Sequence, residues 1–141
     1  MALRTIILNI ILVLFISSCS NPKTHEGGGK KNISLPFQID GIEAPKGEKI
    51  DKKRAALTSL KSPELLGSFM QDGFEILLLI GEDQNEQNAI HAISLKGKKM
   101  DEVLLCTYFD MEPAGTDVIV KGREFELRDF VYTKAEDRSY S

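Results

Sequence analysis

Phe74-Glu-Ile-Leu-Leu-Leu-Ile80 is the stretch that decides the fold of this chain of 141 residues. Six of its seven positions are apolar, which is typical of a central β-strand that is covered on both faces. Asp72-Gly73 comes directly before it, and this pair of residues favours a tight hairpin turn. A buried strand that leaves a hairpin turn predicts an antiparallel sheet in this part of the chain.

Further strands are predicted on the C-terminal side of this stretch. Apolar segments alternate there with short polar turns that contain Gly97, Pro113 and Gly122. Strands joined by short turns, without long helices between them, indicate an antiparallel meander. We therefore expect a mainly β domain, either a small sandwich or an open barrel, with one short N-terminal helix. The expected strands span residues 89–95, 100–109, 116–121 and 124–133.

The N-terminal part of the domain is expected to begin with a strand at Ile33. Apolar and polar residues alternate from Ile33 to Ile39, which is the period of a strand with one buried face. Pro36 places this strand at a sheet edge, because proline cannot donate a backbone hydrogen bond to a neighbouring strand. The polar stretch 41–49 then predicts a loop.

A short helix is predicted after this loop. Asp51 is a suitable N-cap for a helix that runs through Lys61, with a weak apolar face. Ser62-Pro63 ends this pattern, because the residue before a proline disfavours helical geometry. The same pair also resembles a helix start, so residues 63–71 fit either a helical turn or a strand.

The last predicted strand changes its apolar phase along its length. Phe125 and Leu127 share one face, whereas Phe130 and Tyr132 fall on the other. Either a bulge at Arg128-Asp129 restores the inward face, or the strand is covered on both sides. The polar residues after 135 are predicted to fray.

The start of the chain has the pattern of an export signal. Arg4 is followed by the apolar run 6–16 and then by Ser17-Ser18-Cys19. A basic residue, a short apolar run and small residues in this order are typical of a secretory signal peptide. The apolar run is shorter than the roughly 20 residues that span a bilayer, so a transmembrane helix is not expected.

Ile16-Ser17-Ser18-Cys19 resembles the lipobox of bacterial lipoproteins. The resemblance implies that signal peptidase II cleaves before Cys19 and that this cysteine carries the acyl chains that anchor the protein. Several acyl chains on one residue give stable membrane attachment. In that family, serine after the cysteine, here Ser20, accompanies sorting to the outer membrane rather than the inner one. An ordinary cleaved signal with an incidental cysteine and an uncleaved anchor remain as alternatives.

Three regions are therefore predicted, namely a signal peptide (1–18), a lipidated cysteine with a flexible tether (19–32) and one β-rich domain (33–141). The tether contains three consecutive glycines and no large apolar side chain, and its length corresponds to a random-coil span of roughly 20 Å. Removal of Arg4 with the signal leaves 17 basic residues against 21 acidic ones. This small charge of mixed sign does not predict nucleic-acid binding.

Few residues suit catalysis or metal binding. Cys106 lies in an apolar run and is predicted to be a buried, inert thiol. His25 falls in the tether and His91 in a strand, and no zinc-ligand spacing or nucleophile-elbow motif is present. Asp83-Gln84-Asn85 begins like a calcium loop, but Gln87 stands where a further oxygen ligand is required. We expect no cofactor and no metal, with a looser calcium site between the acidic loops as an alternative.

Charges are predicted to separate between the two ends of the domain. If the last four strands run up and down in order, basic residues gather at one end and acidic residues at the other. The basic end would suit a phosphate- or carboxylate-bearing envelope component or an acidic protein, whereas charged turns also serve solubility alone. The basic set is Lys96, Lys98, Lys99, Lys121 and Arg123, and the acidic set is Glu82, Asp83, Glu86, Asp110, Glu112 and Asp117.

These features predict a lipid-anchored lipoprotein of the bacterial cell envelope. Its partners would be the membrane, through the N-terminal lipid, and an envelope protein, and we expect a binding or structural module rather than an enzyme. The alternative is a periplasmic inhibitor or immunity lipoprotein that is directed at a hydrolase or toxin. A small hydrolase built around His91 is a third reading.

Overall fold

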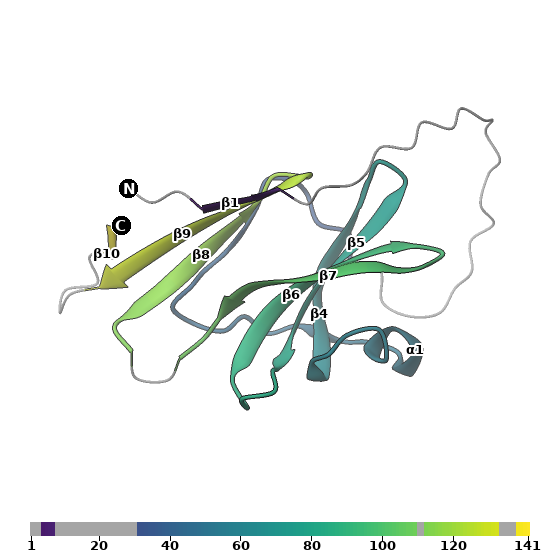
Figure 1. Ribbon diagram of the computed structural model, residues 1–141, viewed down its shortest axis with the longest axis horizontal. Helices are drawn as coiled ribbons and strands as arrows, with labels where there is room; N and C mark the ends of the chain where they lie inside the picture. Colours follow the sequence, from purple (N-terminus) through teal and green to yellow (C-terminus); the bar gives the residue numbers. More distant parts are fainter. Residues whose placement is uncertain (1–3, 8–30, 110–111, 133–137) are drawn as a thin grey trace.

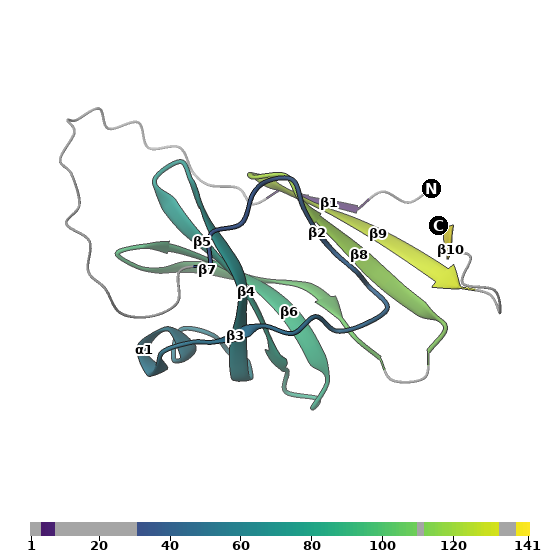
Figure 2. The same cartoon turned by 180° about the vertical axis from the view of Figure 1, so that it is seen from behind.

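A computed structural model describes residues 4–7, 31–109, 112–132 and 138–141, and it shows a mainly β protein. Its strands form two antiparallel sheets that pack as a small sandwich (Figures 1 and 2). Of the two architectures that the sequence left open, the described residues therefore adopt the sandwich. Among these residues, no helix has the length and apolar character needed to cross a membrane.

One sheet, here called the meander sheet, is made of consecutive strands in the order β3-β4-β5-β6-β7. The other, the terminal sheet, has the order β1-β9-β8-β2, with β10 also paired to β9. The meander sheet contains β3 (Glu48–Lys49), β4 (Lys61–Gln71), β5 (Phe74–Glu82), β6 (Asn88–Lys96) and β7 (Lys98–Thr107). The terminal sheet contains β1 (Arg4–Ile7), β2 (Phe37–Ile39), β8 (Ala114–Val120), β9 (Glu124–Tyr132) and β10 (Arg138–Tyr140).

Strand β5 is covered on both faces, as its apolar run predicts. Ile76, Leu78 and Ile80 belong to the core between the two sheets, which also takes Val118, Val120, Phe125 and Leu127 from the terminal sheet. Leu77 and Leu79 point the other way and are fully buried in a second apolar cluster. Because successive side chains of a strand alternate between faces, a strand that is apolar at nearly every position needs both clusters.

The second apolar cluster lies on the outer face of the meander sheet. The segment 50–60 covers this face and contributes Ile50 and Leu60 to the cluster. Helix α1 (Lys52–Ala55) belongs to the segment, and Asp51 caps it by accepting a hydrogen bond from the Arg54 N–H at 2.9 Å. The predicted cap is confirmed, but the helix is a single turn and does not reach Lys61.

Two further predictions for the N-terminal half are settled. Residues 63–71 lie in strand β4, so the strand reading is correct and the helical one is wrong. The strand expected from Ile33 is shorter, because β2 begins at Phe37. It pairs with β8 at the end of the terminal sheet, and this edge position agrees with Pro36.

The last four strands do not form one continuous meander. Strand β6 pairs with β7 and β8 pairs with β9, but β7 and β8 belong to different sheets. The connection after β7 therefore carries the chain from one layer of the sandwich to the other (Figure 1).

Strand β9 resolves its change of phase by being covered on both sides. Its register with β8 runs without a shift from Val131 to Phe125, so the predicted bulge at Arg128-Asp129 is absent. Phe130 points away from the inner core and packs against Tyr140 with ring centroids 5.9 Å apart. The last strand thus pairs beside β9, its Arg138 and Tyr140 side chains lie against Phe130 on the outer face, and residues 138–140 are a strand rather than a frayed tail.

Candidate functional site

The basic residues singled out in the sequence lie at two separate turns. Lys96, Lys98 and Lys99 flank the β6–β7 turn, and Lys121 and Arg123 flank the β8–β9 turn. The β4–β5 turn lies against the second of these, since Arg123 contacts Asp72 at 2.6 Å. This acidic residue interrupts the predicted basic end of the domain.

Most of these cations are engaged by side chains of the same domain. Lys99 forms an ion pair with Glu102, and Lys121 forms one with Glu126. The ammonium of Lys96 lies 5.2 Å from the centroid of the Phe74 ring, which is within cation–π range. Lys98 is exposed. The β6–β7 turn therefore presents the more accessible positive charge.

The acidic residues divide between a surface hollow and a buried position. Glu86 and Glu112 line a polar hollow of about 240 Å³ beside Tyr108 and Phe109, so two distant acidic loops do meet. Asp117 does not join them, because it lies within strand β8 and is 1% exposed. Asp110 lies outside the described residues, as do His25 and Cys19.

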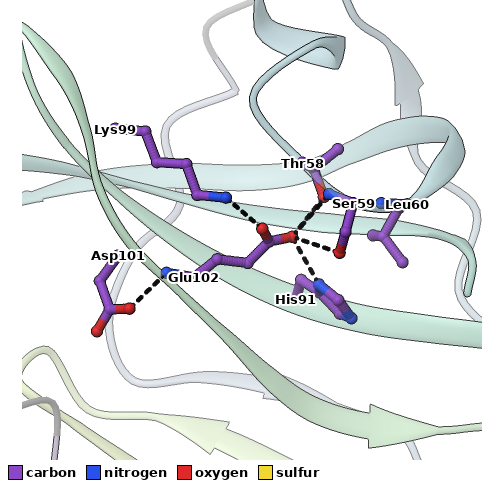
Figure 3. Close-up of polar contacts among 7 residues, drawn as sticks. All are labelled: Thr58, Ser59, Leu60, His91, Lys99, Asp101 and Glu102. Atoms are coloured by element: carbon purple, nitrogen blue, oxygen red, sulfur yellow. Dashed lines mark hydrogen bonds and ion pairs between the residues drawn. The ribbon is translucent and has the colours of Figure 1, made fainter.

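A more elaborate polar cluster surrounds Glu102 on β7 (Figure 3). Its Oε1 accepts hydrogen bonds from the Thr58 hydroxyl at 2.7 Å and from the Ser59 N–H at 3.1 Å. The Ser59 hydroxyl lies 3.2 Å from the same oxygen, and His91 Nδ1 lies 2.8 Å from it. Lys99 contacts the other oxygen. Only 13% of the Glu102 side chain is exposed, so four neighbours replace most of its water.

These contacts hold Glu102 ionised. Burial alone would raise its pKa, but hydrogen bonds from Lys99, His91, Thr58 and Ser59 outweigh it and lower the pKa to about 2. The hydroxyls of Thr58 and Ser59 are directed at the carboxylate rather than at the imidazole. A serine nucleophile requires a histidine placed to take its proton. Here both hydroxyls bond to the carboxylate instead, and these bonds tie the segment before β4 to strand β7.

A second buried carboxylate, Asp117, is held on the outer face of the terminal sheet. Nη1 of Arg138 donates to both of its oxygens at 2.8 Å, and the Tyr140 hydroxyl donates at 2.9 Å. The Gly41 N–H adds a fourth bond at 2.8 Å. A side chain at Gly41 would collide with the backbone of Thr116, so only glycine allows this close approach.

Arg138 connects this cluster to the loop after β2 and to the aromatic residues of β9. Its Nη2 donates to Asp40 at 2.7 Å, and its guanidinium carbon lies 4.8 Å from the Phe130 ring centroid. The bond to Asp40, with the nearby charge of Asp117, raises the pKa of Arg138. Burial would raise the pKa of Asp40, but the bonds from Arg138 and from the Ile42 N–H lower it.

Cys106 is buried and unpaired, as its apolar surroundings predict. Burial is the main reason that its pKa rises to about 11, so at neutral pH the sulfur stays a thiol and is a poor nucleophile. Burial likewise raises the pKa of Tyr108, whose hydroxyl donates to the Asp40 carbonyl at 2.8 Å.

Sequence reasoning did not find either carboxylate cluster. The sequence contains one indication of the Asp117 cluster. Asp117 opens the otherwise apolar stretch Asp117-Val-Ile-Val120, and a charge inside a strand needs a partner. Glu102 and Thr58 are 44 positions apart in the chain, and no local pattern links them. Within the described ranges, no group of three or more His, Cys, Asp or Glu side chains is arranged to hold a metal ion.

The chain was also compared with known proteins. No protein-family model, curated protein or solved structure matched it.

Proposed function

We propose that this chain is a lipid-anchored binding protein of the bacterial cell envelope, without catalytic activity of its own. The observation that carries the proposal is the order of Arg4, a short apolar run and Ile16-Ser17-Ser18-Cys19. Cleavage before Cys19 and acylation of its thiol would leave the domain on a short glycine-rich tether. Ser20 favours the outer membrane as the site of attachment.

The geometry of the domain supports binding rather than catalysis. In the described part of the chain, the most elaborate side-chain cluster directs its hydroxyls and imidazole at Glu102. These groups therefore stabilise the fold by satisfying a buried carboxylate. The exposed lysine of the β6–β7 turn, Lys98, together with Lys96, is the part of the predicted basic end that can meet an acidic partner.

The anchor is tested by metabolic labelling with palmitate in a bacterial host. We expect label on the wild-type chain and on Cys106→Ala, and none on Cys19→Ala. Because both variants replace a cysteine by alanine, Cys106→Ala controls for general effects of the substitution. An unlabelled wild-type chain, or a full-length product recovered from the cytosol, would overturn the proposal.

The binding role is tested by capture from solubilised envelope with the mature lipoprotein as bait. Lys96→Glu/Lys98→Glu should lose the retained partner, whereas Lys52→Glu/Lys53→Glu, an equal charge change on exposed residues of α1, should keep it. Equal retention by both variants would remove the β6–β7 turn from the proposal. Recovery of one hydrolase or toxin, inhibited by the bait, would instead favour the inhibitor role.

A further inference from the structure

The four strands that could end the two sheets differ in how well their edges are protected. Strand β3 has two residues, and β2 has three and follows Pro36. Strand β7 is interrupted by two register shifts and begins with charged residues. Short strands, proline, bulges and charges are the usual protections of an open edge. Strand β9 is nine residues long, contains no proline and keeps an unbroken register with β8 from Phe125 to Val131, so charged side chains are the one protection of this kind that it carries.

The outer edge of β9 is covered by other strands of the chain. Backbone pairing joins β1 to residues 124–127, and β10 pairs with residues 130–132 (Figure 1). Strand β1 lies in the segment that the proposed function removes with the signal peptide. Among the described residues, no other strand pairs with this side of residues 124–128, which in the mature protein would therefore be an open strand edge beside β10.

Backbone hydrogen bonds at the two ends of β9 indicate which residues of this edge are available. The Lys121 N–H donates to the Glu124 carbonyl at 3.0 Å, so the even-numbered residues of β9 bond to β8. The Ser141 N–H donates to the Asp129 carbonyl at 3.2 Å on the opposite side. The backbone N–H and C=O groups of the odd-numbered residues thus point toward the outer edge of the sheet. Those of Phe125 and Leu127 lose their partners when β1 is removed.

We propose that this edge pairs antiparallel with the same edge of a second copy of the mature chain, an inference that rests on the removal of residues 1–18 in the proposed function. In a symmetric pair, residues whose backbone groups point toward the edge must lie opposite each other. One residue of β9 therefore faces its own copy, and the two-fold axis lies midway between the two. The candidate centres are Phe125, Glu126 and Leu127.

Charge and steric contacts select Glu126 as the centre. A pair centred on Leu127 would place Phe125 opposite Asp129 of the second copy, whose carbonyl already accepts from Ser141. A pair centred on Phe125 would place Glu124 opposite Glu126 twice, which makes two like-charge contacts where a pair centred on Glu126 makes one, and like charges directly opposite destabilise a sheet.

The Glu126-centred pair has favourable neighbours on both sides of its centre. Phe125 lies opposite Leu127, and Glu124 lies opposite Arg128, each contact occurring twice by symmetry. The two Glu126 residues face each other, but each is already neutralised by Lys121 and by Arg128, whose Nε lies 2.6 Å from its Oε1. Anchoring both copies in one membrane raises their local concentration, which favours a pair with so short an interface.

Disulfide trapping tests this register. In the proposed pair Glu126 faces itself at a non-hydrogen-bonded position, where Cα atoms are about 4.5 Å apart, a spacing that a disulfide accepts. Mature Glu126→Cys should give a cross-linked dimer under mild oxidation. Glu124→Cys is the control, because its counterpart lies four residues along the partner strand, roughly 13 Å away. A monomer for both variants, or equal cross-linking, would overturn the inference.

Charge reversal adds a test that does not depend on one substitution. In the Glu126→Cys background, Glu124→Lys or Arg128→Glu alone should reduce cross-linking roughly tenfold, because each creates two like-charge contacts. The double variant Glu124→Lys/Arg128→Glu should restore it. Failure of the double variant to recover cross-linking, while remaining folded by circular dichroism, would contradict the pairing.

The precursor and an unlipidated chain separate this inference from the proposed function. In the Glu126→Cys background, the full-length chain with Cys19→Ala keeps β1 and should not form the cross-link. Residues 19–141 with Cys19→Ser, in the same background, should form it. Cross-linking of this shorter chain without palmitate labelling of the wild type would refute the anchor and support the pairing. Labelling without cross-linking would refute the pairing and leave the anchor intact.

Discussion

The two sheets cover their outer faces by different means. On the meander sheet, the segment 50–60 adds Ile50 and Leu60 to a closed apolar cluster and is fastened at its rim by Glu102. On the terminal sheet, the last strand β10 is held by the buried carboxylate of Asp117 and the ring of Phe130. The first cover depends on apolar burial, whereas the second depends on a charge network.

This difference determines how each cover should respond to substitution. Apolar burial is spread over many contacts and needs no single partner. A buried charge concentrates its stabilisation in a few bonds, and removal of one partner leaves the other charge uncompensated. The terminal sheet should therefore be the more sensitive to loss of one polar side chain, whereas the response of the meander sheet to acid should depend on Glu102, the carboxylate at the rim of its cover.

The largest effect is expected for Arg138→Ala. Breaking a fully buried ion pair costs about 3–5 kcal/mol. Arg138 keeps 23% of its side chain exposed, and Gly41 and Tyr140 remain as donors, so we expect a loss of about 2 kcal/mol in the free energy of unfolding. Urea denaturation of the mature chain measures it.

The matched control for this change is Arg128→Ala in the same sheet. Arg128 is 45% exposed and pairs with Glu126, and exposed ion pairs contribute little. It should shift the urea midpoint much less than Arg138→Ala. Equal shifts for the two variants would mean that β10 is not held by the charge of Asp117.

The next effect is an acid-dependent loss of stability at Glu102. Its pKa in the folded protein is about 2, below the ordinary value of 4.5. The ionised carboxylate therefore stabilises the fold fully above pH 4.5, and this contribution disappears as the pH falls toward 2. Between pH 6 and pH 3, the wild type should lose about 1–2 kcal/mol more than Glu102→Gln.

Urea titrations at both pH values measure this difference. Glu86→Gln, in the exposed β5–β6 turn, is the control and should follow the wild type at each pH. A Glu102→Gln variant whose acid sensitivity equalled that of the wild type would show that the cluster in Figure 3 does not link pH to stability.

Local patterns predicted most strands because their causes are local. The apolar run 74–80, the Asp72-Gly73 turn and the Asp51 cap each depend on residues within a few positions of one another, and the structure contains all three. The helix was predicted too long because Leu57 and Leu60 suit a helical face equally well. Leu60 instead enters the cluster that covers β5.

Contacts between distant segments could not be predicted in this way. Arg138 and Asp117 are 21 positions apart, and Arg138 and Asp40 are 98 apart. Their pairing depends on β10 joining β9 and β2 joining β8 in the terminal sheet, which the spacing of the strands does not specify. For the same reason Asp117 was predicted at an acidic end of the domain, although it is buried within β8.

The smallest effect is expected where a charge pair covers no apolar surface. Arg123 and Asp72 connect two turns, and 62% of the Arg123 side chain is exposed. Arg123→Ala should leave the urea midpoint unchanged within error, because solvent screens the pair. Arg54→Ala should lower it, since Arg54 lies on the cover of the meander sheet, is 19% exposed and pairs with Glu75 at 3.1 Å. If Arg123→Ala proved the more damaging, the contact between the β4–β5 and β8–β9 turns, rather than the outer covers, would hold the two sheets together.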